Sequence, residues 1–158
     1  MTRTNEAEPG AATRGVGDLA IVSKLPTGAG SLTQWTPGGS APAATNWEGV
    51  DDAAPDDAVT LNSTTGVGNA DLFAMADLSA GTPAAVMVKL RHAKDDAGAS
   101  AIAALIKSGG TTAQGADLTP TTSWQSSLTN MPNDPATGAP WASIAALNAA
   151  EVGYKRTG

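Results

Sequence analysis

The chain has 158 residues, the length of a single domain, and carries a formal net charge of −6. It contains no cysteine, which excludes disulfides, thiolate catalysis and cysteine-ligated zinc. The acidic balance argues against nucleic acid as a partner, and no apolar run is long enough to predict a membrane span.

Large apolar side chains are sparse. The hydrophobic fraction is 41%, but much of it is alanine, and the chain has only one Phe, one Tyr and four Trp. A buried large side chain contributes about 1.5–3 kcal/mol, so a core of this composition predicts modest stability for a single copy. We therefore expect contacts with other chains to add to its stability.

The chain begins with a segment that has no hydrophobic periodicity. Residues 1–17 are small, polar and interrupted by Gly and Pro, which predicts a flexible N-terminal arm, with an ordinary frayed terminus as the alternative. Residues 18–158 are predicted to form the folded domain. Its first strand is expected at Leu19–Val22, and residues 25–46, rich in Gly, Pro, Ser and Thr, are expected to form a long loop with a brief strand at its centre.

Three strands are predicted in the middle of the chain, over Ala58–Asn62, Asp71–Met75 and Ala84–His92. The first places Val59 and Leu61 on one face. The third is the clearest, because its residues alternate with a period of two. Val86, Val88 and Leu90 face one way, whereas Met87, Lys89 and Arg91 face the other.

The next segment, Ser100–Lys107, is compatible with a strand or a short helix. The polar turn before it and the Gly109-Gly110 pair after it favour a strand, in a β-hairpin with Ala84–His92. A further strand is predicted over Thr121–Thr129, because Thr and Trp suit a pleated surface.

The chain is predicted to end with one short helix and a strand. Pro140 suits the start of a helix, and the apolar residues after it recur at helical spacing. Gly153 is expected to stop the helix, and Val152–Lys155 is predicted to be the last strand. Short strands separated by Gly, Pro and Asp predict a mainly β protein. The expected architecture is an antiparallel β-sandwich or jelly roll with one short C-terminal helix and the flexible N-terminal arm.

The densest group of charged residues surrounds Pro55. Its carboxylates, Asp51, Asp52, Asp56 and Asp57, are the oxygen ligands that calcium prefers. Their spacing does not match the twelve-residue EF-hand loop, and the alternative is a solvated acidic turn. We favour the turn and predict no metal site and no cofactor.

No catalytic pattern is found elsewhere. His92 is the only histidine, and neither a nucleophile elbow nor a phosphate-binding loop occurs, since Gly66-Val67-Gly68 and Lys107–Gly110 both read as turns. The tryptophans could form a platform for sugars, but in a chain this poor in large residues we expect them to be core or interface anchors. They are Trp35, Trp47, Trp124 and Trp141.

Several segments, in a fixed order, resemble a family of small structural proteins of tailed bacteriophages. They are Asn46–Asp52, Asp56–Leu61, Asp71–Leu78, Ala85–Leu90, Lys94–Gly98, Lys107–Gly110 and residues 134–154. The last is the most recognisable, with an Asp-Pro-x-Thr-Gly-x-x-Trp turn, a short Leu-Asn-Ala-like helix and a final strand containing Gly. The resemblance extends over residues 46–156. The chain departs from the family in having Leu61 where an aromatic is usual and in its alanine-rich helix.

The resemblance implies a β-sandwich virion component without catalytic residues, placed on the head or in the tail. Our leading hypothesis is a head decoration or cement protein on the capsid surface. Its partners would be the major capsid protein, neighbouring virion subunits and further copies of itself, with the arm along a neighbour. The alternatives are a minor tail or tail-tip protein and, less favoured, a module that binds host glycans.

Overall fold

The computed structural model describes residues 21–158, so the predicted arm and residues 18–20 lie outside the described part of the chain. The elements in chain order are β1 Pro26–Thr33, β2 Thr36–Gly38, β3 Leu61–Ser63, β4 Ala70–Met75, β5 Met87–His92, β6 Ile102–Ser108, β7 Thr111–Gln114, β8 Gln125–Asn130, α1 Ile144–Asn148 and β9 Glu151–Arg156. Strands therefore dominate, and the one described helix is short, as the sequence predicted.

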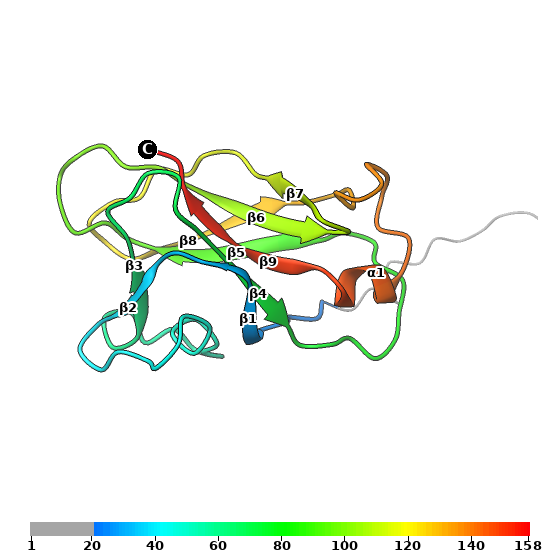
Figure 1. Cartoon of the computed structure of the whole chain (residues 1–158), viewed down its shortest axis with the longest axis horizontal. Helices are drawn as coiled ribbons and strands as arrows, with labels where there is room; N and C mark the ends of the chain where they lie inside the picture. The colour runs from blue at the N-terminus through cyan, green and yellow to red at the C-terminus, as the bar shows by residue number, and fades with distance from the viewer. Residues whose placement is uncertain (1–20) are drawn as a thin grey trace, which may run out of the picture.

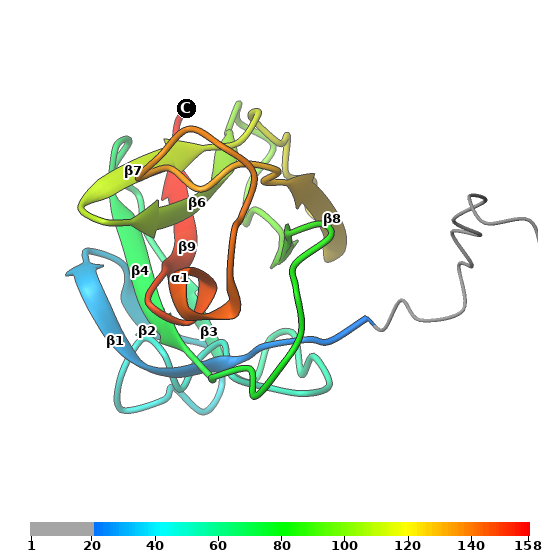
Figure 2. The ribbon, with the colours of Figure 1, turned by 90° about the vertical axis from the view of Figure 1, so that its right-hand side faces the viewer.

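The strands form three antiparallel sheets (Figure 1). The largest has the order β1-β4-β9-β6-β7, a second pairs β5 with β8, and a third pairs β2 with β3. Figure 2 shows β1 and β4 on one side of the molecule and β8 on the other. The arrangement confirms the predicted mainly β, antiparallel sandwich.

The main core lies between the five-stranded sheet and the β5–β8 sheet. Phe73 of β4, Ile106 of β6 and Tyr154 of β9 pack with Val88 and Leu90 of β5, and all five side chains are buried. Apolar burial between two sheet faces is the dominant favourable term in such a fold. The side-chain alternation predicted for Ala84–His92 is thus confirmed on its inward face.

The predicted hairpin between Ala84–His92 and Ser100–Lys107 is wrong, although both segments are strands. β5 pairs with β8, whereas β6 lies between β9 and β7 in the other sheet. The burial patterns explain the separation. β5 alternates between buried and exposed, so one of its faces meets solvent, but β6 is buried almost throughout and needs cover on both faces. Residues 93–101 carry the chain from one sheet to the other.

The predicted long loop over residues 25–46 is also wrong in its first part, where the eight-residue strand β1 forms the edge of the large sheet beside β4. The small residues of β1 allow its backbone to lie close to that of β4, and they do not form a turn. A Cβ atom at Gly30 would overlap the backbone of Leu72. Composition suggests a loop here because the contact that requires glycine lies on another strand.

Further strand predictions fail in part. The strand predicted over Thr121–Thr129 begins only at Gln125, and the one predicted over Ala84–His92 begins only at Met87. Ile21 and Val22, the described residues of Leu19–Val22, lie in no strand, and Ile21 is 94% exposed. In Ala58–Asn62 only the last two residues are in β3, because Asp56 accepts hydrogen bonds from Thr60 and closes a turn before the strand. Val59, predicted to share a face with Leu61, is therefore exposed.

The C-terminal segment follows the prediction with shifted bounds. α1 begins after Ser143, whose hydroxyl accepts a hydrogen bond from Ala146 N, and ends at Asn148. Gly153 does not stop the helix but lies within β9, where a Cβ atom would overlap the Asp71 carbonyl oxygen. No helix among residues 21–158 has the length and apolar character needed to cross a bilayer.

Candidate functional site

The most exposed apolar surface on a regular element is the solvent-facing side of the β5–β8 sheet. Its six side chains, here called the β5–β8 outer face, are Met87, Lys89, Arg91, Ser126, Leu128 and Asn130. Lys89 lies opposite Leu128, and Met87 is the diagonal neighbour of Leu128, within reach of a long side chain. Met87 is 56% exposed and Leu128 is 64% exposed. These two side chains are the largest exposed apolar groups on this face.

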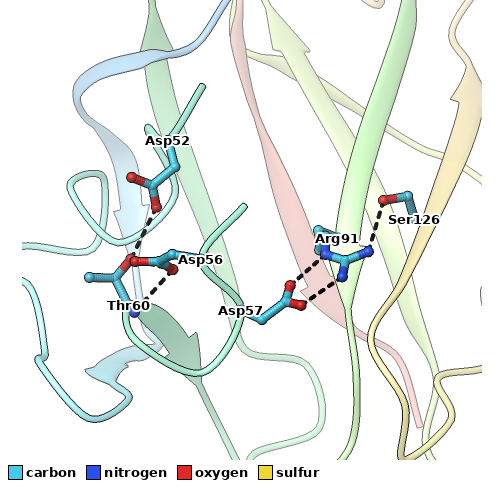
Figure 3. A network of polar contacts seen from close by, with 6 residues as sticks. All are labelled: Asp52, Asp56, Asp57, Thr60, Arg91 and Ser126. Carbon is cyan, nitrogen blue, oxygen red and sulfur yellow. Dashed lines mark hydrogen bonds and ion pairs between the residues drawn. The ribbon is translucent and has the colours of Figure 1, made fainter. Parts of the chain in front are cut away.

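The acidic loop is attached to this face by an ion pair (Figure 3). Arg91 Nε lies 2.6 Å from Asp57 Oδ1, and Arg91 Nη2 donates to Asp57 Oδ2 at 2.8 Å. The ion pair is therefore bidentate. Hydrogen bonds from Arg91 lower the pKa of the Asp57 carboxyl. Asp57 has φ of 54°, a left-handed conformation that Asp tolerates better than most residues.

Two of the other three carboxylates of the loop, those of Asp52 and Asp56, turn toward Thr60 (Figure 3). Asp56 accepts from Thr60 N at 3.2 Å and from Thr60 Oγ1 at 3.0 Å, and Asp52 lies 3.1 Å from the same hydroxyl. Asp51 is half-buried and outside this network. Within residues 21–158, no group of three or more His, Cys, Asp or Glu side chains is placed to hold a metal ion. The carboxylates of Asp56 and Asp57 thus close a turn at Thr60 and attach it to Arg91.

The four tryptophans do not form one platform. Trp141 is buried and its indole N–H donates to the Met131 carbonyl at 2.9 Å, so it is a core anchor. Trp35 and Trp47 are half-buried against the same core, and the Trp35 ring meets Tyr154 edge-on at 4.7 Å between centroids. Trp124 is half-buried outside that cluster.

A buried polar network centred on Asp71 was not expected from the sequence. Asp71 is fully buried in β4, and its carboxylate accepts from Gln34 N at 2.6 Å, Trp35 N at 2.9 Å and Asn46 Nδ2 at 2.6 Å. Asn62 donates to the Asn46 carbonyl and to the Tyr154 hydroxyl, both at 2.7 Å. A single Asp at the start of an otherwise apolar strand was the only available signal.

These groups are structural in their placement. Burial raises the pKa of the Tyr154 hydroxyl far above its ordinary value, so it stays protonated. His92 is also buried, with Nε2 at 3.0 Å from Ser127 Oγ, and burial lowers the pKa of its imidazole. Each polar group serves a hydrogen bond that joins two strands or a strand and a loop.

No family model matches the chain, and no curated protein and no solved structure matches it either.

Proposed function

We propose that this protein is a non-enzymatic structural protein of a bacteriophage virion, a head decoration or cement protein on the capsid surface. It binds the major capsid protein and neighbouring virion subunits through exposed sheet faces. Its task is to bridge subunits of the shell and so stabilise the capsid.

The proposal is carried by one observation, namely where the resemblance residues lie in the fold. Asn46 and Asp71 belong to the buried network, the Asp134 side chain holds the turn before Trp141, and Trp141 is in the core. These four residues of the resemblance therefore hold the fold together, and none of them is exposed. A scaffold held together from inside by these residues leaves its outer faces free for contacts.

The β5–β8 outer face is the surface that we assign to the shell. Met87 and Leu128 offer exposed apolar area, with Lys89 between them and the bidentate pair of Arg91 with Asp57 at one end. Exposed apolar side chains beside charged and polar ones are common in protein interfaces. Many copies on one lattice would add avidity to a contact that is modest in each copy.

Cryo-electron microscopy of the purified virion tests the proposal. We expect density for the chain at regular lattice positions on the capsid surface, with the β5–β8 outer face toward the shell. Quantitative mass spectrometry of the same particles should then give a copy number that scales with the number of shell subunits. Density confined to the tail, with a low copy number, would replace the proposal by the tail-protein alternative.

A further inference from the structure

A lysine and an asparagine from opposite ends of the described chain meet where α1 closes one end of the sandwich. Lys24 precedes β1 and Asn148 is the last residue of α1, 124 positions later, yet Lys24 Nζ donates to Asn148 Oδ1 at 3.1 Å. The segment before β1 passes close to α1 in both views (Figures 1 and 2). The contact joins the edge strand of the large sheet to the segment before its central strand β9.

The main chain of Leu78, just after β4, fixes the orientation of the Asn148 amide. Leu78 N donates to Asn148 Oδ1 at 2.9 Å, and Asn148 Nδ2 donates to the Leu78 carbonyl at 3.0 Å. Both polar atoms of the amide are thus held, and Lys24 approaches the same carbonyl oxygen. A backbone N–H on that oxygen is the kind of donor that stabilises negative charge developing during acyl transfer.

The surroundings favour a reactive amine. Asp77, next to Leu78, lines the same surface pocket as Asn148, together with small residues including Ala74 and Ala149. Burial lowers the pKa of the Lys24 amine, while the negative charge of Asp77 acts in the opposite direction. Desolvation increases the neutral fraction of an amine, and the neutral form is the nucleophile.

We propose that Lys24 and Asn148 form an intramolecular isopeptide bond after the chain has folded. Lys24 Nζ attacks Asn148 Cγ, so that an Nζ–Cγ bond forms and the Cγ–Nδ2 bond breaks. A water molecule carries the proton from Nζ to the departing nitrogen, which leaves as ammonia. No oxidant, reductant or further reactant is needed, because one amide replaces another.

Proximity is the main source of the rate. Holding an amine against a carbonyl in a fixed geometry converts a bimolecular step into an intramolecular one, with effective molarities of about 10⁵ M or more in well-oriented cases. The bond would tie the start of β1 to the end of α1, so that the edge strand could not separate from the sheet without breaking a covalent link. This inference is independent of where the protein acts.

Intact-mass spectrometry of the purified full-length chain under denaturing conditions tests the bond. We expect a mass lower than that of the linear sequence by one molecule of ammonia, and a branched tryptic peptide joining the Lys24 and Asn148 segments. Lys24→Arg, which keeps the charge but removes the nucleophile, should restore the full mass.

Lys107→Arg is the matched control, since Lys107 contacts Ser31 and Glu151 instead of an amide and the lower mass should persist. Wild-type protein that is folded by circular dichroism and has the full linear mass overturns the proposal. An ammonia loss that persists in Lys24→Arg also overturns it, because that loss does not involve Lys24. If Lys24→Arg does not fold, the wild-type protein still tests the proposal: the branched peptide supports it, and its absence overturns it.

Discussion

Asp71 illustrates how a single residue organises the loops around β4. Its buried carboxylate accepts three hydrogen bonds from two backbone N–H groups and one amide, all from residues 34–46. Asp71→Ala removes the acceptor of all three donors, and although Asn46 Nδ2 keeps its second hydrogen bond to the Trp35 carbonyl, each group left unsatisfied away from water costs about 1–3 kcal/mol. We therefore expect the free energy of unfolding in urea to fall by about 3 kcal/mol or more.

Asp95→Ala is the control for this prediction. Asp95 lies exposed in the turn after β5, and surface substitutions of this kind change stability by less than about 0.5 kcal/mol. Equal stability of the two variants would show that the network around Asp71 contributes nothing beyond an ordinary surface carboxylate.

His92 predicts a pH dependence of stability. Burial lowers the pKa of its imidazole in the folded state, whereas the unfolded chain has the ordinary value of about 6.5. As the pH falls below about 6.5, the unfolded state takes up a proton that the folded state resists, so the free energy of unfolding decreases. The His92 contribution is thus present at neutral pH and is lost on acidification.

Thermal unfolding of wild type and His92→Gln at a series of pH values between about 7 and 5 measures this effect. The carboxylates act alike in both proteins, so the difference between the two curves isolates the histidine. We expect the melting temperature of wild type to fall further than that of the variant as the pH decreases over this range. Parallel curves would mean that His92 takes up its proton equally well in the folded and the unfolded state.

At the scale of elements, the outer face of the β5–β8 sheet leads to a prediction about binding. Met87→Ser with Leu128→Ser removes two exposed apolar side chains and leaves the inward face of the sheet intact. If this face contacts the shell, the double variant should fold as wild type but occupy capsids at a reduced level in a co-sedimentation assay. Val67→Ser is the matched control, because Val67 is 65% exposed but lies in a turn away from this sheet.

Sequence patterns predicted those elements whose signal is local. The alternation in β5 shows its two faces directly, and the apolar run in β6 was correctly assigned as a strand. The predicted hairpin failed because local patterns do not specify which strand is the partner. β1 was missed because its glycines resemble a loop until Leu72 on β4 is seen beside Gly30.

The candidate sites were less predictable for a related reason. The Asp71 network depends on side chains from three separate segments, and the pair of Lys24 with Asn148 spans most of the chain. Neither has a fixed spacing that a motif could show. By contrast, the acidic turn and Trp141 as a core anchor could be read from the sequence, because a charged cluster beside Pro and a rare large aromatic residue each have one common structural role.

At the scale of the whole molecule, a cement protein should change the stability of the particle to which it binds. Each copy that bridges two shell subunits buries surface that must be exposed before the shell opens, and ligands that bind only the closed state stabilise it by mass action. Capsids that lack this chain should therefore release their DNA at a lower temperature than complete particles. Adding purified wild-type protein should restore the higher temperature, whereas the Met87→Ser and Leu128→Ser double variant should restore it only at higher protein concentrations. Heating the particles in the presence of a DNA-binding dye measures the release, and equal release temperatures with and without the chain would contradict a cementing role.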